Sequence, residues 1–380
     1  MNKLNVLISG GAGFIGSNLA LQLLQRGHKV TVLDNLSEQI HGVNPESSSP
    51  LFLSIKNNVT FIKGTVTAAD DWNKAIAGND VIVHLAAETG TGQSMYQIKK
   101  YSDVNIGGTA LMLDILANTK TAVKKVVVAS SRAIYGEGKY LSEELGPVYP
   151  GHRLAKDMDA GNFEVTWPGA AKPLQLVATD EESKIHPSSV YGITKQNQEQ
   201  MVMTVCPSIG IAPVAFRYQN VYGPGQSLSN PYTGILSIFS TLIKNNKPIN
   251  IFEDGKESRD FVYIDDVVRA TCLGIEKEEA NGQVFNVGSG KAIPVSEVVA
   301  LLLKYYATEV PVQVSGNYRL GDIRHNYADT DKIKRLLGFT ADVDFTSGLK
   351  RFTEWVNEQE VQQSRYEDSI TEMRSKGLLK

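Results

Sequence analysis

Short apolar runs alternate with helical patterns along the first third of the chain. The pattern predicts strands at residues 4–9, 29–33, 59–63, 80–85 and 125–129, and helices over 14–26 and roughly 95–118. Val81–Val83 and Val126–Val128 are apolar without a break, as in strands that are buried on both faces of a sheet. Strands separated by helices indicate right-handed βαβ units. We therefore predict an α/β fold of the Rossmann type, with a doubly wound parallel sheet.

The alternation stops at residues 140–186, where repeated glycines and prolines predict an insertion of loops and short elements. A helix over 189–205 and a strand over 213–217 follow, and the chain beyond Tyr218 is mixed α/β, ending in a charged, helix-prone segment over 353–380. This organisation predicts two domains. The ranges are 1–216 for a sheet domain that contains the insertion 140–186 and to which 262–287 returns, and 217–261 with 288–380 for a smaller mixed α/β lobe.

Composition excludes several classes of protein. The 38 basic and 41 acidic side chains give a net charge of −3, which argues against a nucleic-acid-binding surface. No apolar run approaches the ~20 residues that span a bilayer, and the amino terminus lacks the apolar stretch of a signal peptide. Two cysteines, Cys206 and Cys272, favour a reducing cytoplasm, and the six histidines lack metal-ligand spacing. We expect a cytoplasmic protein without a nucleic-acid, membrane or metal partner.

A glycine-rich turn follows the first predicted strand. Residues Gly10-Gly11-Ala12-Gly13-Phe14-Ile15-Gly16 contain G-x-x-G-x-x-G between a strand and a helix. Such glycines allow a tight turn and let backbone N–H groups approach a pyrophosphate at the positive end of the helix. Glycine triplets alone also occur in ordinary loops, but this position between strand and helix is the one that a dinucleotide site requires.

Asp34 ends the second predicted strand and is followed by Asn35. A carboxylate at this position can accept hydrogen bonds from the adenosine ribose hydroxyls and would repel a 2′-phosphate. An Asp-Asn pair could also serve a turn alone. Because no arginine follows in Asn35–Ser37, the sequence favours NAD over NADP as cofactor.

Tyr191 and Lys195 stand four residues apart at the start of a predicted helix, which places both on one helical face. A free tyrosine titrates near ~10, and an adjacent ammonium together with a cationic nicotinamide would lower the pKa of Tyr191. Ser131 follows an apolar strand and should lie at the carboxyl edge of the sheet, where ligands bind. A surface pair and a strand-end turn are the simpler alternatives. Together these residues predict a catalytic Ser131, Tyr191 and Lys195.

Eight motifs run in one order along nearly the whole chain and resemble those of the extended short-chain dehydrogenase/reductases, in the nucleotide-sugar epimerase/dehydratase family. They are Gly10–Gly16, His84–Ala87, Asp103–Asn105 with Gly108-Thr109, Ser130–Gly136, Tyr191–Lys195, Arg217–Gly223, Arg259–Asp266 and Asn286–Gly290. The resemblance implies bound NAD and a nucleotide-diphosphate sugar as substrate.

Site residues are implied by the same resemblance. Those assigned to the cofactor are Gly10, Gly13, Phe14, Ile15, Gly16, Asp34, Asn35, Thr65, Val66, Leu85, Ala86, Ala87, Asn105, Tyr191, Lys195 and Tyr218. Those assigned to the nucleotide sugar are Glu88, Thr89, Ser131, Arg132, Asn220, Asn230, Arg259, Arg319 and Asp322. A guanidinium suits bidentate phosphate binding at Arg259, whereas Arg319 and Asp322 could equally form a surface ion pair.

The chain departs from the family pattern at two places. Gly64-Thr65-Val66 stands where relatives often carry an acidic residue for adenine, which leaves the adenine contact open. The segment between Ser131 and Tyr191 is unusually long because of the insertion 140–186. This insertion should cover or border the sugar site, and an exposed elaboration without a role in turnover is the alternative.

The reaction type is predicted from Arg132-Ala133, which directly follow Ser131. Dehydratases resembling this chain place Asp-Glu there for proton transfer, a task that arginine and alanine cannot perform. The remaining chemistry is epimerisation at carbon 4 through a transient 4-keto sugar. Residues 87–96 and 131–138 resemble most closely the dTDP-L-rhamnose 4-epimerases, which form dTDP-6-deoxy-L-talose.

Several other functions remain open. They are a UDP-sugar 4-epimerase, a nucleotide-sugar dehydratase, a one-way oxidoreductase and a non-catalytic NAD sensor, the last disfavoured by the intact Tyr191 and Lys195. Relatives pair as homodimers through a four-helix bundle, here formed by residues 104–118 and 189–205. Leu111, Leu113, Ile115 and Leu116 offer more apolar surface than one core-facing stripe needs, so we expect a homodimer.

Overall fold

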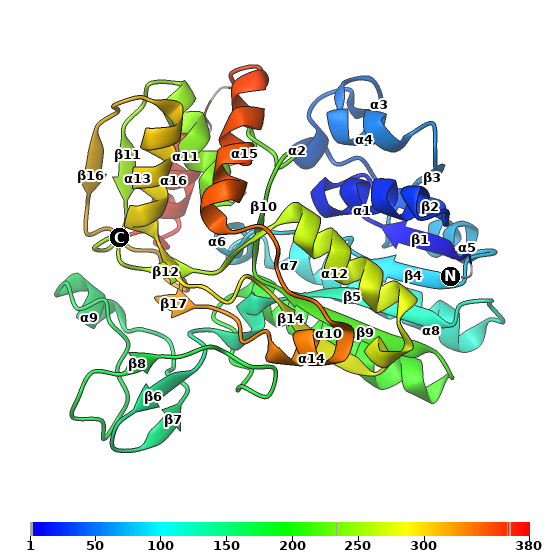
Figure 1. Cartoon of the computed structure of the whole chain (residues 1–380), viewed down its shortest axis with the longest axis horizontal. Helices are drawn as coiled ribbons and strands as arrows, with labels where there is room; N and C mark the ends of the chain where they lie inside the picture. The colour runs from blue at the N-terminus through cyan, green and yellow to red at the C-terminus, as the bar shows by residue number, and fades with distance from the viewer. Residues whose placement is uncertain (1–2, 233, 363, 365) are drawn as a thin grey trace.

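A parallel sheet forms the centre of the computed structural model, which describes residues 3–232, 234–362, 364 and 366–380 (Figure 1). Its seven strands follow the order β14-β9-β5-β4-β1-β2-β3, and all neighbours are parallel. The strands are β1 (Asn5–Ser9), β2 (Lys29–Asp34), β3 (Thr60–Lys63), β4 (Val81–His84), β5 (Lys125–Ser131), β9 (Ala212–Tyr218) and β14 (Gln283–Val287). The predicted Rossmann-type α/β fold is confirmed.

Helices cover both faces of this sheet. On one face α1 (Phe14–Gln25) packs beside α12 (Ile264–Glu276), and Leu19 and Val267 join one apolar core. On the other face α5 (Ala69–Ile76), α8 (Gly108–Asn118) and α10 (Val190–Ser208) enclose a second core. Strands β4 and β5 lie between the two cores, which explains why their sequences are apolar without alternation.

The long helix predicted over residues 95–118 is divided in the structure. Short α6 (Thr91–Ser94) and α7 (Ile98–Tyr101) precede a π-helical turn over Ser102–Gly107, which leads into α8. Such a bulge shifts the positions of side chains on a helix and often occurs near functional sites. Here it turns Asn105 inward, where the side chain is completely buried.

Apolar residues of α8 pack within the chain itself. Leu113, Ile115 and Leu116 are buried in the second core, and Leu111 is partly exposed. These side chains therefore do not form the exposed apolar face from which we expected a dimer. The homodimer through a four-helix bundle remains a prediction.

The insertion 140–186 forms a small antiparallel sheet and a short helix at the lower left of Figure 1. Its elements are β6 (Tyr140–Ser142), β7 (Gly146–Val148), α9 (Ala155–Asp159) and β8 (Gln175–Leu176). Tyr140 and Val148 of the strands pack with Val165, whereas Met158 of α9 packs with Phe163 and Tyr318. The structure thus agrees with the predicted loops and short elements.

The remaining elements gather beside the carboxyl edge of the sheet, where α11, α13, α15 and α16 stand together in Figure 1. Helices there are α11 (Ile235–Lys244), α13 (Val295–Tyr306), α15 (Phe345–Glu358) and α16 (Tyr366–Ser375), whereas α14 (Asp331–Leu337) packs against β14 of the large sheet. Strands are β10 (Asn220–Tyr222), β11 (Ile249–Ile251), β12 (Ser258–Arg259), β13 (Phe261–Tyr263), β15 (Ile293–Pro294), β16 (Val312–Val314) and β17 (His325–Asn326). Residues 262–287 leave this group and supply α12 and β14 to the large sheet. The exact division into two domains remains a prediction.

Short helices also follow β2, namely α2 (Glu38–His41), α3 (Pro45–Ser48) and α4 (Pro50–Ile55). In the part of the chain that the structure describes, no helix is both long and apolar enough to cross a membrane.

Candidate active site

The glycine turn between β1 and α1 is required by close backbone contacts. Gly10 has a φ of +71°, and a Cβ there would lie 2.7 Å from the nitrogen of Ala86. A Cβ on Gly16 would lie 2.4 Å from the carbonyl oxygen of Gly10. Both positions therefore exclude any larger residue, and the turn brings backbone N–H groups to the start of α1.

Asp34, at the end of β2, is held against this turn. Its carboxylate accepts hydrogen bonds from the backbone of Ala12 at 3.0 Å and of Leu36 at 2.8 Å. His41 of α2 lies 3.8 Å away, and its pKa is lowered by burial, an effect that Asp34 opposes. The fixed carboxylate is suited to ribose hydroxyls, as the sequence predicts.

At Gly64-Thr65-Val66, an acidic residue comes from another element. Asp71 of α5 accepts a hydrogen bond from the backbone of Thr65 at 2.9 Å, and a Cβ on Gly64 would collide with it. Asp71 of the following helix thus fixes the turn at the end of β3 through this hydrogen bond. Thr65 and Val66 line the cavity described next.

A cavity of about 490 Å³ runs from the glycine turn to Tyr191. Every residue that the sequence assigns to the cofactor lines it, with the exception of Asn105. Of the residues assigned to the nucleotide sugar, the cavity is lined by Glu88, Thr89, Ser131, Arg132, Asn220 and Asn230. The glycine cradle, the fixed Asp34 carboxylate and this continuous cavity together fit NAD.

Asn105 acts from behind the cavity. Its amide accepts a hydrogen bond from the backbone of Glu88 at 2.7 Å and donates to Thr194 on α10 at 2.9 Å. It therefore ties the segment after β4 to the helix that carries Tyr191 and Lys195. Its predicted role at the cofactor stays a prediction.

Ser131, Tyr191 and Lys195 meet at the carboxyl edge of the sheet and all line the cavity. Ser131 ends β5, and its hydroxyl accepts from the backbone of Ala133 at 3.1 Å. Ser189 caps α10 by accepting from Gly192 at 3.1 Å, and the backbone of Tyr191 donates to Ser94 of α6 at 3.0 Å. These contacts set the first turn of α10, on which Tyr191 and Lys195 follow one another.

We expected the ammonium of Lys195 to lower the pKa of Tyr191, but the pKa of Tyr191 is raised. Burial raises the pKa of Tyr191, and a hydrogen bond from Ser131 and the charge of Arg132 only partly oppose it. Burial also lowers the pKa of Lys195 to about 7. The groups of the protein thus disfavour the phenolate, and the positive charge of a nicotinamide ring would act in the opposite direction.

Arg259, Arg319 and Asp322 do not line the cavity. The guanidinium of Arg259 donates to the carbonyl oxygens of Arg324 at 2.9 Å and Ile323 at 2.7 Å. Arg319 pairs with Asp322 at 2.8 Å beside a small separate hollow. An ion pair was the alternative to substrate contact for these two residues, and they do form one. Their contact with a diphosphate, like that of Arg259, remains a proposal.

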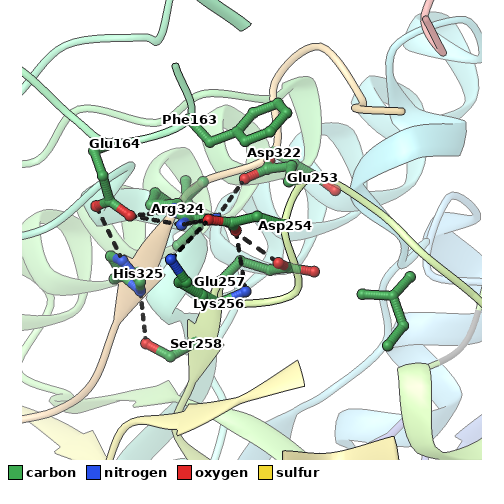
Figure 2. Close-up of polar contacts among 12 residues, drawn as sticks. Phe163, Glu164, Glu253, Asp254, Lys256, Glu257, Ser258, Asp322, Arg324 and His325 are labelled. Atoms are coloured by element: carbon green, nitrogen blue, oxygen red, sulfur yellow. Dashed lines mark hydrogen bonds and ion pairs between the residues drawn. The ribbon is translucent and has the colours of Figure 1, made fainter. Parts of the chain in front are cut away.

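A network of charges surrounds Arg324 (Figure 2), whose backbone carbonyl accepts a hydrogen bond from Arg259. Arg324 is 0% exposed, and its guanidinium lies 2.6 Å from Glu164, 2.9 Å from Glu253 and 2.7 Å from Asp254. Burial lowers the pKa of Arg324, but the hydrogen bonds to Asp254 and Glu164 outweigh it and the net pKa is raised. The network fixes the backbone carbonyls that hold Arg259.

Two members of this network, Arg153 and Glu164, belong to the insertion 140–186. Arg153 forms a bidentate pair with Glu253 at 2.7 and 2.8 Å. Residues 140–186 are all described, and none of them lines the cavity. The insertion is thus docked through ion pairs without lining the cavity, and its predicted place over or beside the sugar site stays a prediction.

Glu257 gives this network a pH dependence that can be tested. It lies 3.8 Å from Arg324, and burial raises its pKa to about 7 from 4.5. Because the folded state binds this proton more tightly, its stabilising contribution is complete below about pH 4.5 and is lost as pH rises through about 7.

Glu257→Gln, which is neutral at every pH, should therefore gain stability over the wild type at pH 8 but not at pH 5. Denaturant unfolding of both proteins at several pH values measures this difference. Parallel stability curves would contradict it.

Sequence reasoning missed several residues that line the cavity. They are Gln39 and His41 of α2, Leu51 of α4, and Gln219, Gln226 and Tyr232 beyond β9. The segment after β2 carries no recognisable motif, so only its position after Asp34 could have indicated a role. Gln219 stands directly beside Tyr218 and could have been included on that ground.

Residues 6–153 and 165–288 match the model of the NAD dependent epimerase/dehydratase family. The chain belongs to this family. It is 34% identical to a dTDP-L-rhamnose 4-epimerase of Burkholderia thailandensis over 358 residues, which cover 93% of this chain and 95% of the relative. A putative UDP-glucose 4-epimerase of Methanocaldococcus jannaschii is 28% identical, with 92% of this chain and 98% of the relative covered.

Among solved structures, UDP-glucose 4-epimerase with UDP-glucose from Thermotoga maritima is 28% identical. It superimposes with a TM-score of 0.74 over 93% of this chain and 99% of that chain. The predicted family and the NAD cofactor are thereby confirmed. The protein is an enzyme of the NAD-dependent nucleotide-sugar epimerase/dehydratase family.

Proposed function

We propose that this enzyme inverts carbon 4 of a nucleotide-diphosphate sugar, and that it converts dTDP-L-rhamnose to dTDP-6-deoxy-L-talose. The observation that carries the reaction type is the pair Arg132-Ala133 beside the catalytic residues. Burial lowers the pKa of Arg132 only to about 10, so the side chain keeps its proton near neutral pH. Ala133 has no group that could move a proton.

The carboxylates around the cavity support epimerisation over dehydration. In the part of the chain that the structure describes, Asp34 and Glu88 are the acidic residues that line the cavity. Asp34 is bound to the glycine turn, and Glu88 pairs with Lys100 at 2.9 Å. Asp180 and Glu181 of the insertion are engaged by Lys139 and by the backbone of Asn286. Dehydration needs both an acid and a base at carbons 6 and 5, so a cavity lining with these engaged carboxylates supports the proposed epimerisation.

Epimerisation needs fewer groups from the protein. Tyr191 takes the proton of the 4-hydroxyl and later returns it, while Ser131 hydrogen-bonds the same oxygen. Lys195 holds a positive charge near Tyr191. Bound NAD would supply the acceptor, and then the donor, of the hydride at carbon 4. The sugar must turn its other face between these two steps, for which Arg132, Asn220 and Asn230 offer polar contacts at the cavity wall.

The sugar itself is proposed from similarity. The dTDP-L-rhamnose 4-epimerase of Burkholderia thailandensis shares more identity with this chain than the UDP-glucose 4-epimerases do. A UDP-sugar 4-epimerase is the second candidate, because these relatives match over almost the same length. We also propose that the enzyme acts in the cytoplasm as a homodimer.

A product analysis tests the reaction and the sugar together. The enzyme is incubated separately with dTDP-L-rhamnose, UDP-glucose and UDP-glucuronate, and products are resolved by chromatography and mass spectrometry. We expect a product of unchanged mass with inversion at carbon 4 and no net NADH, formed fastest from dTDP-L-rhamnose. A product lighter by one water would show a dehydratase, and preference for a UDP-sugar would reject the proposed substrate.

A further inference from the structure

A chain of buried polar side chains lies behind the catalytic edge, outside the reaction described above. It joins Ser9 of β1, His84 of β4, Thr109 of α8, and Gln198 and Lys195 of α10. Their exposed fractions are 0% for the first four residues and 3% for Lys195. Lys195 is the member that reaches the cavity. The chain thus connects the catalytic lysine to the strand that precedes the glycine turn.

Gln198 is the direct partner of the catalytic lysine. The ammonium of Lys195 donates a hydrogen bond to Gln198 Oε1 at 2.8 Å, one helical turn along α10. On its other side, Gln198 Nε2 donates to Thr109 Oγ1 at 2.8 Å. The amide therefore bridges Lys195 and α8.

Thr109 determines which way this amide points. Its hydroxyl donates its one hydrogen to the carbonyl oxygen of Asn105 at 2.6 Å. Thr109 Oγ1 can consequently only accept from Gln198, so the amide nitrogen must face Thr109 and the amide oxygen must face Lys195. The orientation of Gln198 is dictated by its neighbours.

The other titratable groups near Lys195 are neutral or paired with other residues. His84 Nε2 lies 3.3 Å from Gln198, and burial lowers the pKa of His84 to about 3, so this imidazole is neutral. Tyr191 precedes Lys195 by one turn and is protonated in the resting protein. Glu199, the next carboxylate on α10, is paired with Arg217 at 2.6 Å. Among the described residues, Gln198 is the hydrogen-bond acceptor for Lys195.

A buried ammonium is costly unless acceptors receive its hydrogens. We propose that Gln198 is a positioning residue for Lys195, whose amide oxygen keeps the ammonium protonated and holds it beside Tyr191. This inference rests on the proposed function only for the catalytic use of Lys195. The buried chain through Thr109 and His84 then serves to hold the amide of Gln198 in one orientation.

Two substitutions should act in opposite directions. Gln198→Met keeps the length of the side chain but removes the acceptor, so Lys195 loses its proton at lower pH and the alkaline limb of the rate profile moves down. With less positive charge nearby, Tyr191 ionises at higher pH, so the acid limb moves up and the profile narrows. Gln198→Glu adds a negative charge beside the ammonium, so the alkaline limb should move to higher pH.

The readout is the first hydride transfer, seen as enzyme-bound NADH after rapid mixing of the holoenzyme with dTDP-L-rhamnose or UDP-glucose. Rates are measured from about pH 6 to about pH 9. We expect Gln198→Met to slow this step about 10-fold to 100-fold near neutral pH, as small misplacements of catalytic groups do. Gln200→Met, the same substitution at an exposed position of α10, is the matched control and should leave the profile unchanged.

The outcomes separate this inference from the proposed function. NADH formation without a 4-epimer would reject the proposed function. The acid and alkaline limbs of the pH–rate profile would still test whether Gln198 positions Lys195. If neither sugar reduces the cofactor, retention of NAD by the holoenzyme is measured over the same pH range in place of the rate. Release of NAD from Gln198→Met at a lower pH than from the wild type would support the positioning role of Gln198. The inference is overturned if the limbs of the pH–rate profile stay in place in both Gln198→Met and Gln198→Glu, or if only the melting temperature changes. Gln198 would then have a purely structural role.

Discussion

Tyr191→Phe is expected to abolish turnover while NAD stays bound. The substitution removes the one hydroxyl that can take and return the proton of the sugar and leaves the ring in place. General acid–base groups contribute about 10²-fold to 10⁴-fold to a rate, and we expect a loss in that range. The cavity should keep its shape because Tyr191 is fixed through its backbone N–H, which donates to Ser94 at 3.0 Å.

Epimer formation and cofactor content of the purified variant measure this prediction. Tyr305→Phe removes a hydroxyl that donates to a backbone carbonyl far from the site, and it serves as the matched control. Activity of Tyr191→Phe close to that of the control would remove Tyr191 from the mechanism. Loss of NAD together with activity would instead show that its hydroxyl holds the cofactor.

Arg324→Met should cost stability more than any other single change in the network of Figure 2. The side chain is 0% exposed, and its removal leaves the carboxylate of Glu253, itself 4% exposed, with one guanidinium partner fewer. Breaking a buried ion pair in this way costs about 3–5 kcal/mol. A shift of the denaturant midpoint to lower concentration measures it.

Two comparisons give the Arg324 experiment its control. Arg335→Met changes an exposed arginine of α14 and should alter stability little. Glu164→Gln removes a network member whose side chain is 64% exposed, for which a loss of about 1 kcal/mol or less is expected. Similar midpoints for Arg324→Met and Arg335→Met would mean that the network adds nothing to folding.

Arg324→Met should also weaken sugar binding if Arg259 contacts the substrate. The backbone carbonyls of residues 323 and 324 hold the guanidinium of Arg259 at 2.7 and 2.9 Å. A rise in the Michaelis constant at temperatures where the variant is folded would support this link. The sequence motif indicated Arg259 as a residue for the nucleotide sugar, but it did not indicate that the carbonyls of residues 323 and 324 bind its guanidinium.

Local patterns predicted most of the fold. Continuous apolar runs such as Val81–Val83 are typical of strands buried on both faces of a sheet, and the observed β4 lies between two cores. The glycine turn was predictable from its motif between a strand and a helix, although the close contact that requires Gly10 comes from the distant Ala86. Patterns failed where packing overrode them, as in the π-helical turn at Ser102–Gly107 that brings Asn105 against α10.

The sequence by itself thus determined the parallel sheet, the cofactor turn and the trio Ser131, Tyr191 and Lys195, because strand periodicity and motif spacing are local properties. Only the tertiary structure decided which buried charges and amides meet. Arg153 and Glu253 come from distant parts of the chain, and so do Gln198 and Thr109. Burial makes each such group dependent on a partner, but the partner's place in the sequence is set by the folded arrangement of the elements, which no local pattern records.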